Sequence, residues 1–396
     1  MDDQVQFNVS APWSWNARHF VDRGCPRTGG AEFLLYSDSH VTGGLEITCH
    51  PYVLTNCLGF PQSGRLGPVL ALYFDDHSPD LDVQPMDKTD TDGWLNLTLD
   101  DEIACIISLV TEVRLRSGGP VRSFKGEEDL RGTPHLYGHH VPEWTATQRP
   151  IYPTPKQIGL ESLDGWMDRY FALGREDAVT LVRAARQFRD ALWVADTDPE
   201  LAWLLLVSGL EVIAGREALR DVDPSELLRQ ELPELAAQLV ETGGEAHLAA
   251  VAPQLVGVVR ATARFMSCVE QYLPGPPPVR PEAYAQVGWD WPNLKKRVSQ
   301  VYGYRSARLH GGVPFPSPLC QVPMSSGAAL DERPSGLAAA AGNASWLAKD
   351  LPMHLHTFGY IVRGCLLHWW QKSSSGTSTE ASAMSPSPVL ESDDTR

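Results

Sequence analysis

One arginine and one histidine in this chain have the residue types and spacing for acid–base chemistry at a phosphate. They lie in the stretch VYGYRSARLHGG, where Arg305 precedes His310 by five positions. A histidine exchanges a proton near neutral pH, and a guanidinium stabilises the charge that develops on a phosphodiester during cleavage. Taken alone, however, this spacing is more typical of a basic surface helix that ends in a capping histidine.

The residues around this pair predict a helix that positions both side chains. Asp290 is a candidate N-cap, Pro292 is tolerated in a first turn, and Gly311-Gly312 is a C-cap signal. Five residues of a straight helix turn through about 500°, so the two side chains lie about 140° apart unless His310 swings back past the last turn. The predicted inward stripe consists of Leu294, Val298, Val301 and Leu309.

Apolar residues at helical spacing fill the second half of the chain and predict a bundle of five or six helices. The segment 201–215 is apolar on most faces, so we expect the central buried helix there. A kink is expected at Pro253. An irregular segment, 311–345, separates the Arg305 helix from a last helix over 346–370 and represents either a lid or an insertion. The predicted helices cover 175–196, 197–215, 223–244, 245–273, about 290–310 and 346–370.

The segment from about 165 to 372 resembles the HEPN superfamily, specifically its Apea-like branch. In that family a late helix carries Y-x-x-R-S-x-x-x-H-G, and this chain reads Tyr302-Gly-Tyr-Arg305-Ser306-Ala-Arg-Leu-His310-Gly311. The family also has an earlier buried helix with an LE-x-L/I segment, which LAWLLLVSGLEVIAG at 201–215 matches in character and order.

The resemblance implies an endoribonuclease that needs neither metal nor cofactor and acts as a homodimer on RNA. By this resemblance Arg305 stabilises the phosphorane, His310 acts as general acid or base, and Ser306 positions a phosphate or the histidine. The 2′-hydroxyl attacks the neighbouring phosphate and leaves a 2′,3′-cyclic phosphate. Many family members serve in antiviral defence or as toxins. In this chain Ser306 stands where many active nucleases carry Asn, Asp or His.

Three further residues are candidates for binding or orienting the substrate: Glu211, Arg308 and Tyr302. Glu211 lies within an apolar helix, and a buried carboxylate needs a partner, for which Arg305 or Arg308 is available. The alternative is that Glu211 points to solvent. Two other functions stay open: a non-catalytic HEPN module for dimerisation or nucleotide binding, and a target of nucleotide transfer with Tyr302 or Tyr304 as acceptor.

The first 120 residues are rich in short runs of β-branched and aromatic residues between turn signals, and they predict strands at 31–37, 44–54 and 67–76. Leu95, Leu97 and Leu99 alternate as in a strand, followed by a helix or a second strand. We expect an α+β protein whose N-terminal part senses a protein or phage-derived trigger, restrains the nuclease or selects the RNA. The predicted divisions are a β-rich or α+β domain (1–120), an extended linker (121–160), an all-α HEPN-like bundle (161–372) and a disordered tail (373–396).

Composition excludes several classes of protein. A formal charge of −16 disfavours non-specific binding to a polyanion, so RNA requires a local site. No run approaches the ~20 apolar residues of a membrane span, and the acidic start MDDQVQFNVS is unlike a secretory signal, which predicts a soluble cytoplasmic protein without membrane partners. Seven scattered cysteines form no C-x-x-C pair. His135, His139 and His140 lack a fitting further ligand, so no metal site is expected.

Overall fold

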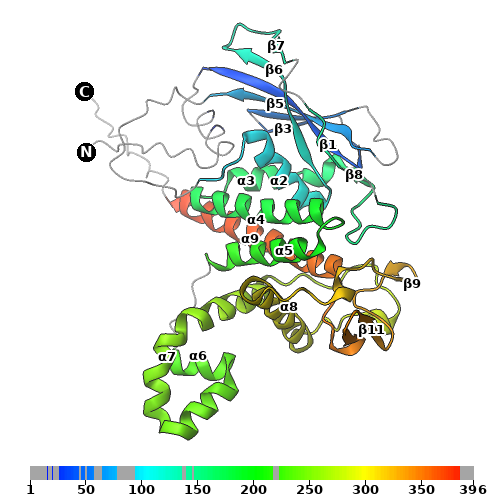
Figure 1. Cartoon of the computed structure of the whole chain (residues 1–396). Helices are drawn as coiled ribbons and strands as arrows, with labels where there is room; N and C mark the ends of the chain where they lie inside the picture. The colour runs from blue at the N-terminus through cyan, green and yellow to red at the C-terminus, as the bar shows by residue number, and fades with distance from the viewer. Residues whose placement is uncertain are drawn as a thin grey trace, which may run out of the picture.

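The computed structural model describes residues 16, 20, 26–43, 46–49, 51–57, 65–77, 94–135, 140–144, 147–216 and 223–383. It shows a mixed α/β protein, with a sheet formed by the N-terminal part of the chain and helices in the C-terminal half (Figure 1). This agrees with the predicted α+β composition and with the predicted order of strands before helices.

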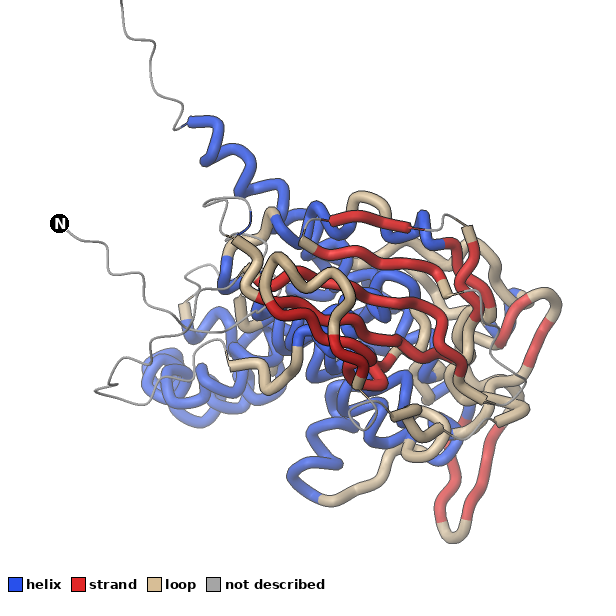
Figure 2. The backbone as a smooth tube through the Cα atoms, turned by 90° about the horizontal axis from the view of Figure 1, so that it is seen from above, coloured by secondary structure: helices blue, strands red, loops and turns tan. Residues whose placement is uncertain are grey.

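Six antiparallel strands form the sheet in the order β3-β4-β5-β1-β6-β7 (Figure 2). The predicted strands at 31–37 and 67–76 are confirmed, and 44–54 contains the β3–β4 hairpin. A separate short pair joins β2 (His40–Thr42) in parallel to β8 (Gln157–Gly159). The sheet strands are β1 Gly29–Ser37, β3 Glu46–Cys49, β4 Tyr52–Asn56, β5 Gly67–Asp76, β6 Arg116–Lys125 and β7 Thr133–Pro134.

Helix α2 (Leu99–Thr111) lies between the sheet and the other helices (Figure 1). The prediction of an alternating strand over Leu95, Leu97 and Leu99 is wrong. Asn96 has a left-handed backbone with φ of 51°, which interrupts an extended run, and the helix begins three residues later. Of the two possibilities left open for the following residues, the helix is therefore the one that forms.

The helices of the C-terminal half begin at strong N-terminal signals. Asp198, Asp223 and Asp290 each accept a hydrogen bond from a backbone N–H of the first turn, and a proline occupies that turn in each helix. These caps explain why the predicted helix starts agree closely with the structure. The helices are α3 Trp166–Phe171, α4 Arg175–Val194, α5 Pro199–Ala214, α6 Pro224–Glu231, α7 Pro233–Tyr272, α8 Trp291–Gly311 and α9 Leu355–Ala383.

Helix α6 and the first part of α7 extend away from the rest of the helices as an arm (Figure 1). Within α7 the non-helical backbone is at Gly244, with φ of 71°, at the boundary predicted between two helices. Pro253, where a kink is expected, lies inside the helical run. The arm has a small core of its own, formed by Leu227, Leu228, Ala236, Leu248, Ala252 and Ala263.

The predicted domain division does not coincide with a break in the packing. One hydrophobic core includes sheet residues such as Leu35 and Leu72 together with Phe188 of α4 and Trp370 of α9. The predicted linker begins inside β6, and Tyr152 within it is fully buried. The sheet and the helices therefore fold around a shared core.

The segment 311–345 is structured rather than a free loop. It contains the short hairpin β9–β10 (Ser325–Ser326 with Ala329–Leu330) and most of a second one, β11–β12 (Ala338–Ala341 with Ala344–Leu347), which ends two residues beyond it. Phe315 stacks on Trp203 of α5, with 5.8 Å between ring centroids, and is almost fully buried. The first part of this segment is therefore an integral part of the core.

The last helix differs from its predicted range at both ends. β12 and a short 3-10 turn (Ala348–Asp350) occupy the first predicted residues, and α9 starts at Leu355. It continues to Ala383, into the predicted disordered tail, while 384–396 lie outside the described residues. Among the helices that the structure describes, none combines the length and apolar character that a bilayer-spanning segment requires.

Candidate active site at the contact of α5 and α8

Helix α8 positions the Arg305 motif, and its first half is fixed by the core. Leu294, Val298 and Val301 are fully buried, as the predicted inward stripe requires. Leu309, the fourth member of that stripe, is 52% exposed, so this part of the prediction is wrong. After Val301 no residue of α8 is fully buried, although Tyr302 and Tyr304 still pack against the core, and the motif therefore lies on a partly exposed final portion of α8.

Arg305 forms an ion pair with Glu211 of α5. Its Nη2 lies 2.7 Å from Glu211 Oε2, and the hydroxyl of Tyr302 donates to Oε1 of the same carboxylate at 3.1 Å. The partner expected for Glu211 is thus present. The side chain is about one-fifth exposed, and its Nε is buried without a hydrogen-bond partner in the described structure. Glu211 therefore fixes Nη2 of Arg305, while Nη1 has no partner among the described residues and is the nitrogen left for a ligand.

Arg308 repeats this arrangement one turn away. Its Nε lies 2.7 Å from Oε2 of Glu200, in the first turn of α5. Glu200 is not among the residues identified from the sequence, although a signal was available. Eleven residues of helix turn through about 1100°, so Glu200 and Glu211 lie on the same face of α5, to within about 20°. The two carboxylates of α5 therefore face the two arginines of α8.

His310 and Ser306 complete the motif without joining the ion-pair cluster. Helix α8 continues to Gly311, and Gly312 caps it in the left-handed conformation with φ of 64°. His310 is therefore within the last helical turn, about 140° around the axis from Arg305, and it is exposed. Ser306 is half-buried. Within one chain, Arg305 faces α5 while His310 faces solvent.

The environment of the tyrosines opposes their ionisation. Burial, together with the Glu211 carboxylate and its hydrogen bond, raises the pKa of Tyr302, and burial followed by the charge of Asp350 raises the pKa of Tyr304. Both phenols are therefore protonated at neutral pH. Since the Tyr302 hydroxyl is engaged with Glu211, its position favours an orienting role over that of a nucleotide acceptor.

The histidine-rich stretch contributes no metal site among the residues that the structure describes. His135 Nε2 lies 2.7 Å from Ser123 Oγ, and the backbone N–H of His140 donates to Gly118 O at 2.6 Å. His139 lies outside the described residues. The two described histidines of this stretch are thus tied to β6 individually.

Comparison with known proteins adds no relative: no protein-family model, no curated protein and no solved structure matches this chain.

Proposed function

We propose that this protein is a metal-independent endoribonuclease of the HEPN type, active as a homodimer. The observation that carries the proposal is the Arg305–Glu211 ion pair at 2.7 Å, reinforced by Tyr302. It holds a guanidinium whose side chain is about one-fifth exposed and whose Nη1 has no partner among the described residues. A phosphate has the charge and the acceptor oxygens to use the N–H donors of that nitrogen.

In the proposed reaction the RNA 2′-hydroxyl attacks the adjacent phosphorus. The new O2′–P bond forms, the P–O5′ bond breaks, and the products carry a 2′,3′-cyclic phosphate and a 5′-hydroxyl. A histidine accepts the proton of the 2′-hydroxyl or donates one to the leaving oxygen, which is the role of His310. Arg305 stabilises the charge on the phosphorane, and Ser306 positions the phosphate or the imidazole.

The direction of the side chains supports a site shared between two protomers. Arg305 and His310 point about 140° apart around α8, so the two groups of one chain do not converge on one phosphate. A second copy placed against the exposed end of α8 supplies His310 to the partner's Arg305. This dimer is part of the proposal, as are a cytoplasmic setting, a role in antiviral defence or as a toxin, and a trigger bound by the N-terminal part.

The test is cleavage of labelled RNA by the purified full-length protein in EDTA, with Arg305→Ala and His310→Ala. Arg216→Ala and His247→Ala are matched controls, because Arg216 also pairs with carboxylates and His247 is also an exposed helical histidine. Cleavage that yields cyclic phosphate ends and disappears only in the first two variants supports the proposal. Equal cleavage by all four variants contradicts it.

The competing function is a non-catalytic dimerisation or nucleotide-binding module, and one observation favours it. Both Arg305 and Arg308 are already neutralised by carboxylates of α5, as in a purely structural contact. Under that function, His310→Ala and Arg305→Ala change dimerisation or stability, and neither changes RNA processing.

A further inference from the structure

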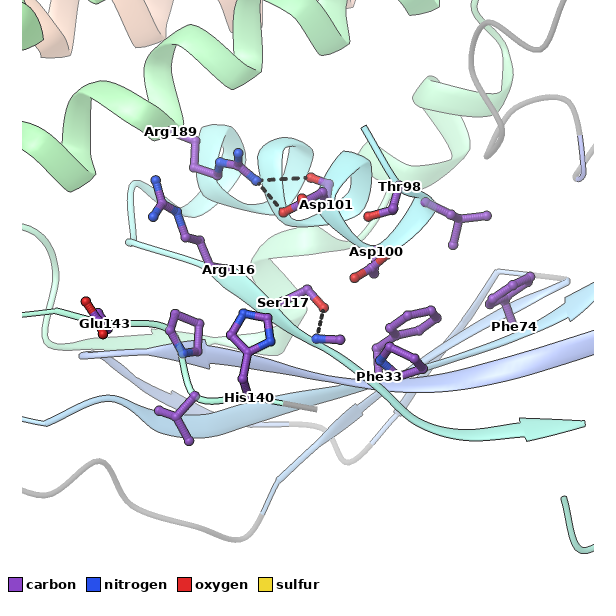
Figure 3. Close-up of a pocket in the computed structure, with 15 residues that line it drawn as sticks. Phe33, Phe74, Thr98, Asp100, Asp101, Arg116, Ser117, His140, Glu143 and Arg189 are labelled. Carbon is purple, nitrogen blue, oxygen red and sulfur yellow. Dashed lines mark hydrogen bonds and ion pairs between the residues drawn. The ribbon is translucent and has the colours of Figure 1, made fainter. Parts of the chain in front are cut away.

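A cleft of about 960 Å³ lies between the sheet, the start of α2 and α4, and shares no residue with the α5–α8 site (Figure 3). Its walls come from segments far apart in the chain: β1, β5, β6, α2, α4 and the loop at 140–143. Pockets for small molecules in proteins have volumes of roughly 300–1,000 Å³. The cleft therefore has room for a ligand of nucleotide size.

One end of the cleft is aromatic. Phe33 of β1 and Phe74 of β5 lie side by side there, with 6.1 Å between ring centroids and 17° between ring planes (Figure 3). Both rings are only partly buried, so they present apolar faces to the cleft. A planar heteroaromatic ring stacks well on such a surface.

Asp100 lies next to this aromatic end and points into the cleft (Figure 3). The residue is only 5% exposed, and no hydrogen bond or ion pair with a described residue involves its carboxylate, whose oxygens open to the cleft rather than being shielded from solvent. Its neighbour Asp101 differs, because Arg189 Nη1 lies 2.9 Å from Asp101 Oδ1. Buried carboxylates need hydrogen-bond donors. Asp100 is therefore an acceptor that a ligand can satisfy.

The other end of the cleft is cationic. Arg189 is held firmly, with Nε and Nη2 each 3.1 Å from Asp190 Oδ1 in addition to its contact with Asp101. Arg116 is held loosely, because its Nη2 is 3.8 Å from the same oxygen, beyond hydrogen-bond distance, and its side chain is 38% exposed. Its guanidinium lies 4.4 Å from the centroid of the Trp193 ring. Arg116 thus has donors available for an anion.

The carboxylates near Arg116 do not fully neutralise the guanidiniums that surround it. Asp190 also pairs with Arg186 at 3.6 Å, so it serves three guanidiniums. Burial, and next the charge of Arg189, lower the pKa of Arg116. Glu143 at the rim is exposed and forms no ion pair with described residues, so solvent screens its charge. An anion bound beside Arg116 relieves this repulsion.

The two ends are separated by a distance that suits one small molecule. Phe33 of β1 pairs with Pro120 of β6, and Tyr36 of β1 pairs with Arg116, across a register irregularity in β6. The three residues of β1 from Phe33 to Tyr36 span roughly 10 Å. This is comparable to the length of an extended nucleoside monophosphate.

We infer that this cleft binds a guanine nucleotide, with the base on Phe33 and against Asp100 and the phosphate beside Arg116. A carboxylate offers acceptors only. Among the common bases, guanine alone presents two adjacent N–H donors, N1–H and the 2-amino group, to both oxygens of one carboxylate. His140 is exposed and also lines the cleft (Figure 3).

The test is isothermal titration of the full-length protein with GMP, IMP and guanosine. IMP lacks the 2-amino group, and guanosine lacks the phosphate. Each lost charge-assisted contact is expected to weaken binding about tenfold. The expected order of affinity is therefore GMP above both IMP and guanosine.

Two variants locate the binding. Asp100→Asn should reduce the preference for GMP over IMP, and Arg116→Gln should reduce the preference for GMP over guanosine. Arg122→Gln is the matched control, because Arg122 is also on β6 and its side chain is 39% exposed, yet it does not line the cleft. Circular dichroism establishes that each variant is folded.

Three results overturn the inference: no binding of GMP at 1 mM (about −4 kcal/mol), equal binding of GMP and IMP, or GMP binding that both cleft variants leave unchanged. None of these results bears on RNA cleavage, because Arg305 and His310 are not part of the cleft. The inference and the proposed nuclease therefore fail or succeed separately.

Discussion

Two arginines of this protein, Arg114 and Arg305, show how differently a guanidinium can be used. Arg114 is 1% exposed, and all three of its nitrogens donate, to two carboxylates, one hydroxyl and two backbone carbonyls. Arg305 is about one-fifth exposed, with Nη2 paired to Glu211, Nε buried and unpaired, and Nη1 without a partner among the described residues. Complete pairing identifies a structural group, while partial pairing near the surface leaves donors for a ligand.

The largest effect is expected when the fully paired arginine is removed. Arg114→Met leaves Asp38 and Asp196 without their buried partner, at 4% and 11% side-chain exposure. Breaking such a pair costs about 3–5 kcal/mol, which should appear in the free energy of unfolding from urea denaturation. Arg216→Ala, at an exposed ion pair, should cost less than about 1 kcal/mol. Equal losses in the two variants would contradict the comparison.

A buried imidazole without a partner also affects stability, and we expect its protonation to lower the free energy of unfolding by less than the loss of Arg114 does. Burial lowers the pKa of His354 to about 4, despite the opposing charge of Asp331, and its Nδ1 has no partner in the described structure. Between pH 6.5 and 4 the unfolded state binds more protons than the folded state. The free energy of unfolding should therefore fall as pH decreases through this range, by about 1.4 kcal/mol per pKa unit for this group.

Urea denaturation at pH 7, 6 and 5 measures this loss. His354→Asn should reduce the slope over this range without abolishing it, because burial also lowers the pKa of the neighbouring His356, to about 3. His310→Ala should leave the slope unchanged, because His310 is exposed. A profile that keeps its full slope in His354→Asn would show that other groups cause the loss.

A small effect on stability is expected when the partner of the partly paired Arg305 is changed, but the effect on activity should be large. Glu211→Gln keeps the shape of the side chain and removes the charge that orients Arg305, at a cost of about 1 kcal/mol in unfolding free energy. Under the proposed mechanism the RNA cleavage rate falls about 10- to 100-fold, as for other positioning contacts.

Glu200→Gln is the matched control, since Glu200 holds Arg308 at the same 2.7 Å distance. It should reduce cleavage less than Glu211→Gln does. Equal cleavage rates in the two variants would mean that the Arg305 pair has no special role.

Local signals in the sequence predicted much of the fold. Strand β5 spans the predicted residues 67–76, and Asp290, Pro292 and Gly312 bound α8 as expected. These signals are short-range, because a cap or a turn depends on neighbouring residues. The error at Leu95, Leu97 and Leu99 has a physical reason. Alternating apolar side chains are typical of a strand, but the left-handed backbone of Asn96 interrupts the extended conformation that a strand requires.

Long-range contacts were predictable only where a buried charge required a partner. The need to pair Glu211 pointed to α8, and the structure supplies Arg305. The sequence contains no comparable signal for the cleft. Its lining residues, from Phe33 to Arg189, are far apart in the chain, and the strand order and the position of α2 bring them together. Apart from His140, which belongs to the histidine-rich stretch, none of its lining residues was identified from the sequence as a candidate for binding.

The most direct test of the proposed active site is RNA cleavage by a 1:1 mixture of Arg305→Ala and His310→Ala. If each site takes Arg305 from one protomer and His310 from the other, a mixed two-fold dimer contains one intact site. The account predicts that each variant alone is inactive and that the mixture recovers about a quarter of the wild-type rate. A mixture as inactive as its components, beside an active wild type, would contradict the shared site.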